Sequence, residues 1–146
     1  MSKKLDHIGI VVKDIDEAAN FYTGILGLPS WNLGIVEDSI NGVRMLSILT
    51  GEIFLELIQP TSKNRFAEFL EEQGGGLFHL CFFVDEFDKE VRALKEKGFI
   101  VEEEVANISP EHPFRLAWLS PKSAQGVWIE LVDMLAVPDE LVHHKF

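Results

Sequence analysis

An internal duplication is the feature of this sequence that most constrains its fold. Residues 7–16 read His-Ile-Gly-Ile-Val-Val-Lys-Asp-Ile-Asp, and residues 79–88 read His-Leu-Cys-Phe-Phe-Val-Asp-Glu-Phe-Asp. Each segment begins with a histidine, runs through apolar residues to a valine, and ends in acids around one apolar residue. The second copy starts 72 positions after the first, from residue 7 to residue 79. This long period indicates two copies of one module rather than a solenoid of short repeats.

A helical pattern follows each copy. Apolar residues recur with the 3.6-residue period over residues 15–26, and Asp14 and Glu17 have the spacing of a capping box. The second helix is expected to end at Gly98, because glycine readily adopts the left-handed conformation that ends a helix. Its apolar face carries Phe87, Val91 and Leu94. Each copy therefore predicts a strand followed by a helix.

Matching strands end the two copies, at residues 53–58 and 127–132. Between helix and final strand, each copy has room for two further strands. The candidates are residues 31–36, 43–49, 100–105 and 114–119. Each module is therefore predicted to be βαβββ, and the chain to have a mixed α+β fold.

We expect one domain with a linker helix between its modules. The boundaries are about 5–60 for module 1, 61–76 for the linker helix, 77–133 for module 2 and 134–146 for a tail without assignment. The inner side of the linker helix carries Phe66, Phe69 and Leu70. Gly74, Gly75 and Gly76 form the expected hinge. We expect His112, between two prolines, to have a loop role, and His143 and His144 to be exposed without a role.

Composition excludes several classes of protein. The 24 acidic and 13 basic residues give a net charge of −11, which argues against a nucleic-acid surface. No apolar run approaches the roughly 18 residues of a membrane span, and the N-terminus does not read as a signal peptide, so the cytoplasm is the expected compartment. The single cysteine, Cys81, excludes an internal disulfide and a multi-cysteine zinc site.

Two glutamates interrupt strands that are otherwise apolar. Glu56 and Glu130 lie in the final strands of the two copies, where burial of a charged carboxylate without a partner costs several kcal/mol or raises its pKa. His7 and His79 are the matching partners, because they are also repeated and also lie on strands. The separation from histidine to glutamate is 49 residues in the first copy, from 7 to 56, and 51 in the second, from 79 to 130.

Two imidazoles and two carboxylates suit a divalent ion such as Mn, Fe, Co, Ni or Zn, and an octahedral ion would keep two positions for water or substrate. For one module alone, a hydrogen-bonded core histidine, or a glutamate paired with Arg44 or Arg115, is the simpler interpretation. The duplication favours the metal site. Cys81 shares a strand face with His79, but it ranks below Glu56 as a ligand because cysteine often serves as a small buried hydrophobe.

These residues resemble the vicinal oxygen chelate superfamily, which includes glyoxalase I, bleomycin-resistance proteins, extradiol dioxygenases and methylmalonyl-CoA epimerase. The similarity rests on the opening Asp-His-Ile-Gly-Ile-Val-Val, on Phe-Tyr and Leu-Gly-Leu after it, and on the stretch from Arg115 to Leu131 with its Pro-Lys-Ser loop. It covers residues 5–133 and is closest to the epimerase. The resemblance implies two paired modules that form a half-open barrel around a metal ion, with cobalt favoured. The implied ligands are His7, Glu56, His79 and Glu130.

The resemblance also implies a reaction. The metal would bind a carbonyl oxygen of an acyl-CoA thioester such as methylmalonyl-CoA, and Glu130, with Glu56 opposite it, would move the adjacent proton. Met45 occupies the position of a further glutamate in bacterial epimerases, so the two metal-bound glutamates are the expected bases, as in glyoxalase I. A homodimer is expected by resemblance.

Three further residues are candidates for substrate binding. Arg115 could grip a substrate carboxylate in bidentate fashion, with a surface ion pair as the alternative. Lys122 and Ser123 could hold a phosphate or a thioester tail, with an ordinary polar turn as the alternative.

Other functions remain open at this point. A glyoxalase-type lyase acting on a hemithioacetal is the nearest alternative. A non-catalytic protein that binds a flat hydrophobic molecule, as bleomycin-resistance proteins do, is the second. An extradiol dioxygenase ranks lower, because a fourth ligand at Glu56 would occupy a position that oxygen and a catechol need.

Overall fold

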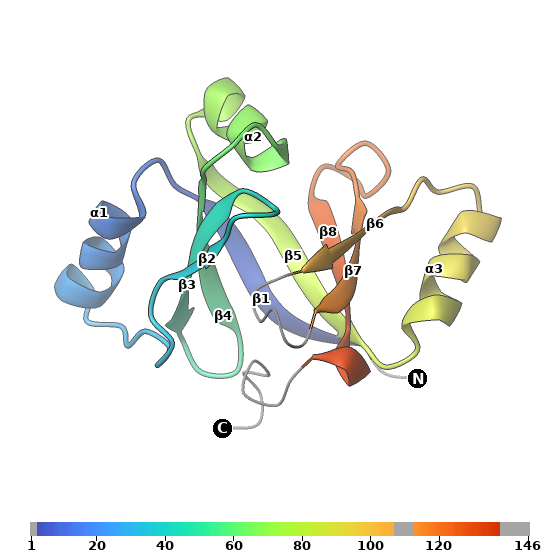
Figure 1. Ribbon diagram of the computed structural model, residues 1–146, viewed down its shortest axis with the longest axis horizontal. Helices are drawn as coiled ribbons and strands as arrows, with labels where there is room; N and C mark the ends of the chain where they lie inside the picture. The colour runs from blue at the N-terminus through green and yellow to red at the C-terminus, as the bar shows by residue number, and fades with distance from the viewer. Residues whose placement is uncertain (1–2, 107–112, 138–146) are drawn as a thin grey trace. The chain divides into compact units, whose positions relative to one another are not determined.

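The computed structural model describes residues 3–106 and 113–137 (Figure 1). His112, His143 and His144 lie outside this described part of the chain. The chain divides into two compact units: His7–Phe78, here called the N-terminal unit, and His79–Phe146 together with Met1–Asp6, called the C-terminal unit. The fold is mixed α+β, as predicted. Of the described helices, none is long and apolar enough to cross a membrane.

The N-terminal unit has the predicted βαβββ order, followed by the linker helix. Its elements are β1 (Lys3–Val11, in this unit from His7 onward), α1 (Ile15–Ala19), the π-helical turn η1 (Asn20–Ile25), β2 (Val36–Asp38), β3 (Val43–Leu49), β4 (Phe54–Pro60) and α2 (Arg65–Gln73). The strands lie in the order β2-β3-β4-β1. The first and last strands, β1 and β4, are parallel, and the other pairs are antiparallel.

The C-terminal unit repeats this pattern. Its elements are β5 (Gly76–Val84, in this unit from His79 onward), α3 (Phe87–Glu96), β6 (Glu102–Ala106), β7 (Phe114–Leu119), β8 (Trp128–Asp133) and the short helix η2 (Met134–Ala136). The strand order is β5-β8-β7-β6, with β5 and β8 parallel. The first and last strands of the module are again neighbours, so the duplication in the sequence is a duplication of topology.

Helix α1 begins where the sequence predicts. The Asp14 carboxylate accepts hydrogen bonds from the backbone N–H groups of Asp16 and Glu17, which have no partner within the helix. Ile15 is fully buried in a core cluster with residues of β3 and β4. The predicted helix extends to residue 26, but from Asn20 onward it is a π-helix, in which the N–H of Leu26 donates to the carbonyl of Phe21.

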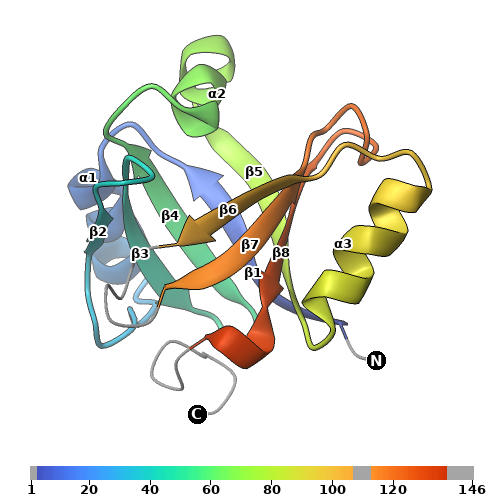
Figure 2. The same ribbon diagram turned by 45° about the vertical axis from the view of Figure 1, so that its right-hand side comes forward.

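Helix α3 packs on the strands of the C-terminal unit, as α1 packs on the strands of the N-terminal unit. Phe87 and Val91 contact Val84, Ala117 and Leu131, which come from β5, β7 and β8. Figure 2 shows α3 running beside these strands. The expected apolar face of this helix is therefore its buried face.

The second strand of the first module differs from the prediction. It was expected at residues 31–36, whereas β2 covers Val36–Asp38. The chain turns first, because the N–H of Gly34 donates to the carbonyl of Trp31 and Gly34 has a φ of +63°. The buried Asp38 then ends the strand by accepting the N–H groups of Ile40 and Asn41.

The glycine run after α2 has positive φ angles at all three residues. Gly74 ends the helix in the left-handed conformation, and a Cβ atom on Gly75 would lie 2.8 Å from the carbonyl oxygen of Val11. Gly75→Ala is therefore expected to lower the free energy of unfolding by more than about 1 kcal/mol, measured by urea denaturation. Gly76→Ala is the control, because a Cβ there meets no atom within 4 Å. Equal losses would show that backbone strain alone, without the clash, sets the cost.

Candidate metal centre

The two faces of β4 and β8 have different surroundings. In β4, Leu57 belongs to the core cluster that includes α1, and in β8, Leu131 packs against α3. Side chains alternate between the faces of a strand. Glu56 and Glu130 therefore lie on the other face of their strands, opposite the face that packs against α1 in β4 and against α3 in β8.

The strand register of the two units is the same around these glutamates. Gly9 of β1 lies opposite Glu56, and Cys81 of β5 lies opposite Glu130. His7 and His79 come two residues earlier on their strands, so each histidine shares a face with the glutamate of its unit. The duplication therefore reproduces not only the residue types but also their diagonal placement on neighbouring strands.

Each histidine turns its Nε2 atom toward the neighbouring glutamate. The distance to Oε1 is 3.5 Å for His7 and Glu56, and 3.4 Å for His79 and Glu130. These distances exceed the usual ~2.7–3.2 Å of an N–H···O hydrogen bond. They match the separation of about 3–3.5 Å expected for two ligand atoms that each lie ~2.1 Å from one first-row cation.

Burial adds to the argument for a cation. His7 is 5% exposed, His79 2% and Glu130 8%, while the Glu56 side chain is 15% exposed. A carboxylate so removed from water needs a positive partner or several hydrogen bonds. Within each unit, one imidazole nitrogen and one carboxylate oxygen thus lie side by side, and both are donor types that suit first-row divalent ions. The residue types of each pair therefore fit the divalent metal that the sequence predicts.

The β3 residues beside Glu56 on its face carry no charge. Ser47 lies opposite Glu56, and Met45 lies opposite Ile58, on the same face. Met45 therefore brings a thioether to the strand position at which the epimerase resemblance implies a further glutamate.

Sequence reasoning missed two tryptophans beside the second pair. Trp118 of β7 lies opposite Glu130, and Trp128 of β8 lies opposite His79. The ring of Trp118 meets the imidazole of His79 edge to face, with 5.1 Å between ring centroids. The signal was available in the alternation of β7, because the neighbouring Ala117 belongs to the core under α3.

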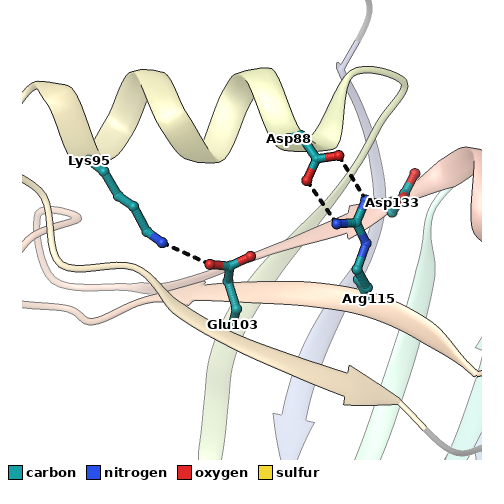
Figure 3. Close-up of polar contacts among 5 residues, drawn as sticks. All are labelled: Asp88, Lys95, Glu103, Arg115 and Asp133. Carbon is teal, nitrogen blue, oxygen red and sulfur yellow. Dashed lines mark hydrogen bonds and ion pairs between the residues drawn. The ribbon is translucent and has the colours of Figure 1, made fainter.

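Arg115 is held in an ion pair beneath α3 (Figure 3). Its two terminal nitrogens bind both carboxylate oxygens of Asp88 at 2.8 and 3.1 Å, and one of them also binds Asp133 at 3.1 Å. The guanidinium carbon lies 4.9 Å from the ring centroid of Phe87. This is the alternative stated for Arg115, an ion pair with acids of the protein. A role in gripping a substrate carboxylate stays a prediction.

The pair formed by Arg115 and Asp88 has a consequence for acid stability. The hydrogen bond from Arg115 lowers the pKa of Asp88 from its ordinary 3.8. The charged form is thus favoured in the folded state, so the stabilisation is present above pH 3.8 and is lost as the pH falls through the lower folded pKa. Asp88→Asn is expected to lower the urea midpoint at about pH 7 and to lower it less at about pH 2, where more of the Asp88 carboxyl is protonated. Arg115→Gln should behave alike, and an equal loss at both pH values would contradict this linkage.

Lys122 and Ser123 lie in the turn between β7 and β8. The N–H of Ser123 donates to the carbonyl of Ser120, and the N–H of Gly126 donates to that of Pro121. Lys122 is exposed, and Gln125 has a φ of +64° in the same turn. Turn chemistry accounts for this conformation, and a role of either residue in substrate binding stays a prediction.

Comparison with known families decides the membership of the chain. Residues 6–117 match the glyoxalase/bleomycin resistance protein/dioxygenase superfamily. The chain belongs to this superfamily. The membership confirms the resemblance seen in the repeated histidine and glutamate strands.

Among relatives in this superfamily, human mitochondrial methylmalonyl-CoA epimerase is 31% identical over 134 residues, which cover 88% of this chain and 72% of the human protein. The uncharacterized Bacillus subtilis protein YqjC is 31% identical over 131 residues, 89% of this chain and 91% of YqjC. The methylmalonyl-CoA epimerase of Streptomyces coelicolor, solved in complex with 2-nitronate-propionyl-CoA, superposes with a TM-score of 0.75 at 27% identity. The match covers 88% of this chain and 95% of the S. coelicolor chain.

Proposed function

We propose that this superfamily member is a divalent-metal-dependent epimerase or isomerase that removes a proton α to a thioester carbonyl. Methylmalonyl-CoA is the proposed substrate. The observation that carries the proposal is the histidine–glutamate pair that recurs, at the same register, in both units. The human and S. coelicolor epimerases among the relatives support the reaction class.

We propose further that His7, Glu56, His79 and Glu130 together hold one ion of Mn, Fe, Co, Ni or Zn, with cobalt favoured by the resemblance. The burial of the pairs and the 3.4–3.5 Å between their donor atoms support this assignment. Such an ion supplies Lewis acidity, which makes the C–H bond beside a bound carbonyl more acidic.

The glutamates would carry the proton. The carboxylate of Glu130 takes the α proton, and the electron pair of the broken C–H bond moves toward the carbonyl oxygen. Glu56, in its acid form, returns a proton to the same carbon. Return to the face opposite the one that was deprotonated inverts the configuration, and the two glutamates then have exchanged protonation states for the reverse reaction.

Solvent exchange tests this proposal directly. The cobalt-loaded protein is incubated with methylmalonyl-CoA in heavy water, and deuterium at the α carbon is measured by mass spectrometry. We expect incorporation well above that of a sample without protein and of a sample treated with a chelator. No incorporation in the presence of metal would rule out the epimerase.

The second candidate function is a glyoxalase-type lyase. The observation that favours it is the face around Glu56, where Met45 and Ser47 provide no further carboxylate. The proton is then moved by the proposed ligand glutamates, as in the epimerase proposal, and this is the arrangement that the resemblance implies for glyoxalase I. Incubation of the same preparation with methylglyoxal and glutathione tests for this activity, and thioester formation without exchange into methylmalonyl-CoA would favour the lyase.

Four further expectations stay predictions. They are cobalt as the native metal, an acyl-CoA thioester as the bound substrate, a homodimer as the oligomeric state and the cytoplasm as the compartment.

A further inference from the structure

The imidazole of His79 contacts an aromatic side chain, Trp118, that the proposed reaction does not use. Trp118 is 3% exposed, and its ring plane makes an angle of 72° with the imidazole. At 5.1 Å between centroids, this is the edge-to-face arrangement that aromatic pairs prefer. The imidazole torsion is intrinsically broad, so a histidine of this kind takes its orientation from its neighbours.

Trp118 has a second aromatic neighbour. Trp128 meets it nearly at a right angle, 87°, with 5.9 Å between the ring centroids. In the strand register, Trp118 lies opposite Glu130 and Trp128 lies opposite His79. Each indole therefore lies on a neighbouring strand, directly opposite one of the two residues of the histidine–glutamate pair.

We propose that Trp118 is a positioning residue that fixes the imidazole plane of His79, so that Nε2 faces Oε1 of Glu130. The observations behind it are the edge-to-face contact, the burial of both rings and the 3.4 Å between the two donor atoms. The proposal rests on the proposed metal site for its functional meaning. Residues that orient a metal ligand without touching the metal typically change affinity 10–100-fold when they are replaced.

Cobalt affinity in matched variants tests the proposal. Trp118→Leu removes the aromatic ring, and Trp118→Phe keeps one. We expect the Kd for Co²⁺, followed by its visible absorption, to rise about 10–100-fold in Trp118→Leu. We expect Trp118→Phe to stay close to the wild type. Trp31→Leu, in the N-terminal unit, is the control for loss of an indole elsewhere and should leave the Kd unchanged.

Orientation is measured separately from metal binding. Crystal structures of the metal-free wild type and both variants give the plane of the His79 ring, and they also establish that each variant is folded. We expect a turned or disordered imidazole in Trp118→Leu and an unchanged one in Trp118→Phe.

An unchanged ring in Trp118→Leu overturns the proposal, as does wild-type cobalt affinity in that variant. If the wild type binds no cobalt, the proposed function fails, and the proposal of a positioning residue for metal binding fails with it. The ring orientation then still shows whether Trp118 orders His79, so the two failures are told apart.

Discussion

His79→Ala is expected to remove bound divalent metal and turnover together. The substitution deletes one of four proposed donors and leaves the 8% exposed Glu130 carboxylate without the imidazole 3.4 Å away. Loss of a residue that merely orients a ligand already costs 10–100-fold in affinity, so loss of a ligand should cost more than about 100-fold. Elemental analysis after dialysis measures metal content, and deuterium exchange into methylmalonyl-CoA measures turnover on the same samples.

Two further variants test this result, one expected to behave like His79→Ala and one expected to keep its metal. His7→Ala, the counterpart in the other unit, should behave like His79→Ala because the register places both histidines alike. Arg115→Gln should keep its metal, because Arg115 is engaged with Asp88 and Asp133. Full metal content in His79→Ala would place the ligands elsewhere. A wild-type protein that carries no metal and refuses cobalt and nickel would favour the non-catalytic binding protein.

Glu130→Gln is expected to reduce turnover far more than metal affinity. The amide oxygen of glutamine can still coordinate a cation, but the amide cannot take a proton at neutral pH. A positioned general base contributes typically 10²–10⁴-fold, so kcat should fall at least about 100-fold. Cobalt titration and the initial rate of deuterium incorporation, measured side by side, separate the two effects.

Glu56→Gln is the matched variant for this experiment. If the two glutamates serve opposite faces, each variant should slow exchange from one epimer of methylmalonyl-CoA more than from the other, with opposite preferences. Unreduced turnover in Glu130→Gln would show that another group is the base, although the metal site could still be present.

The internal repeat predicted the topology well, because the order of strands and helices in each module can be read from short-range sequence patterns. Alternation on the final strands and the position of each histidine were enough to place His7 with Glu56 and His79 with Glu130, and the structure brings each pair together. The predicted position of the second strand was less accurate, because a turn occupies part of the range expected for it. The chain turns at Gly34, and β2 begins only at Val36.

Contacts between distant segments were harder to foresee. Arg115 pairs with Asp88, 27 residues earlier in the chain, and no periodicity indicates which acid an exposed arginine will meet. The contact of Trp118 with His79 depends on the register of β7 against β8 and of β8 against β5. Register depends on the hydrophobic patterns of both paired strands and on the geometry of the turns between them, so the pattern of one strand alone does not say which residues lie opposite each other.

The equal register of the two units has an evolutionary consequence. A gene duplication that copied one ancestral half would leave two equivalent sets of strand positions, so differences between them record later divergence. Opposite Glu56 and His7 stand Ser47 and Phe54, whereas opposite Glu130 and His79 stand Trp118 and Trp128. The two units of this chain thus share the histidine–glutamate pair and differ in the residues opposite it, so a difference between the two halves in binding would arise at these opposite positions.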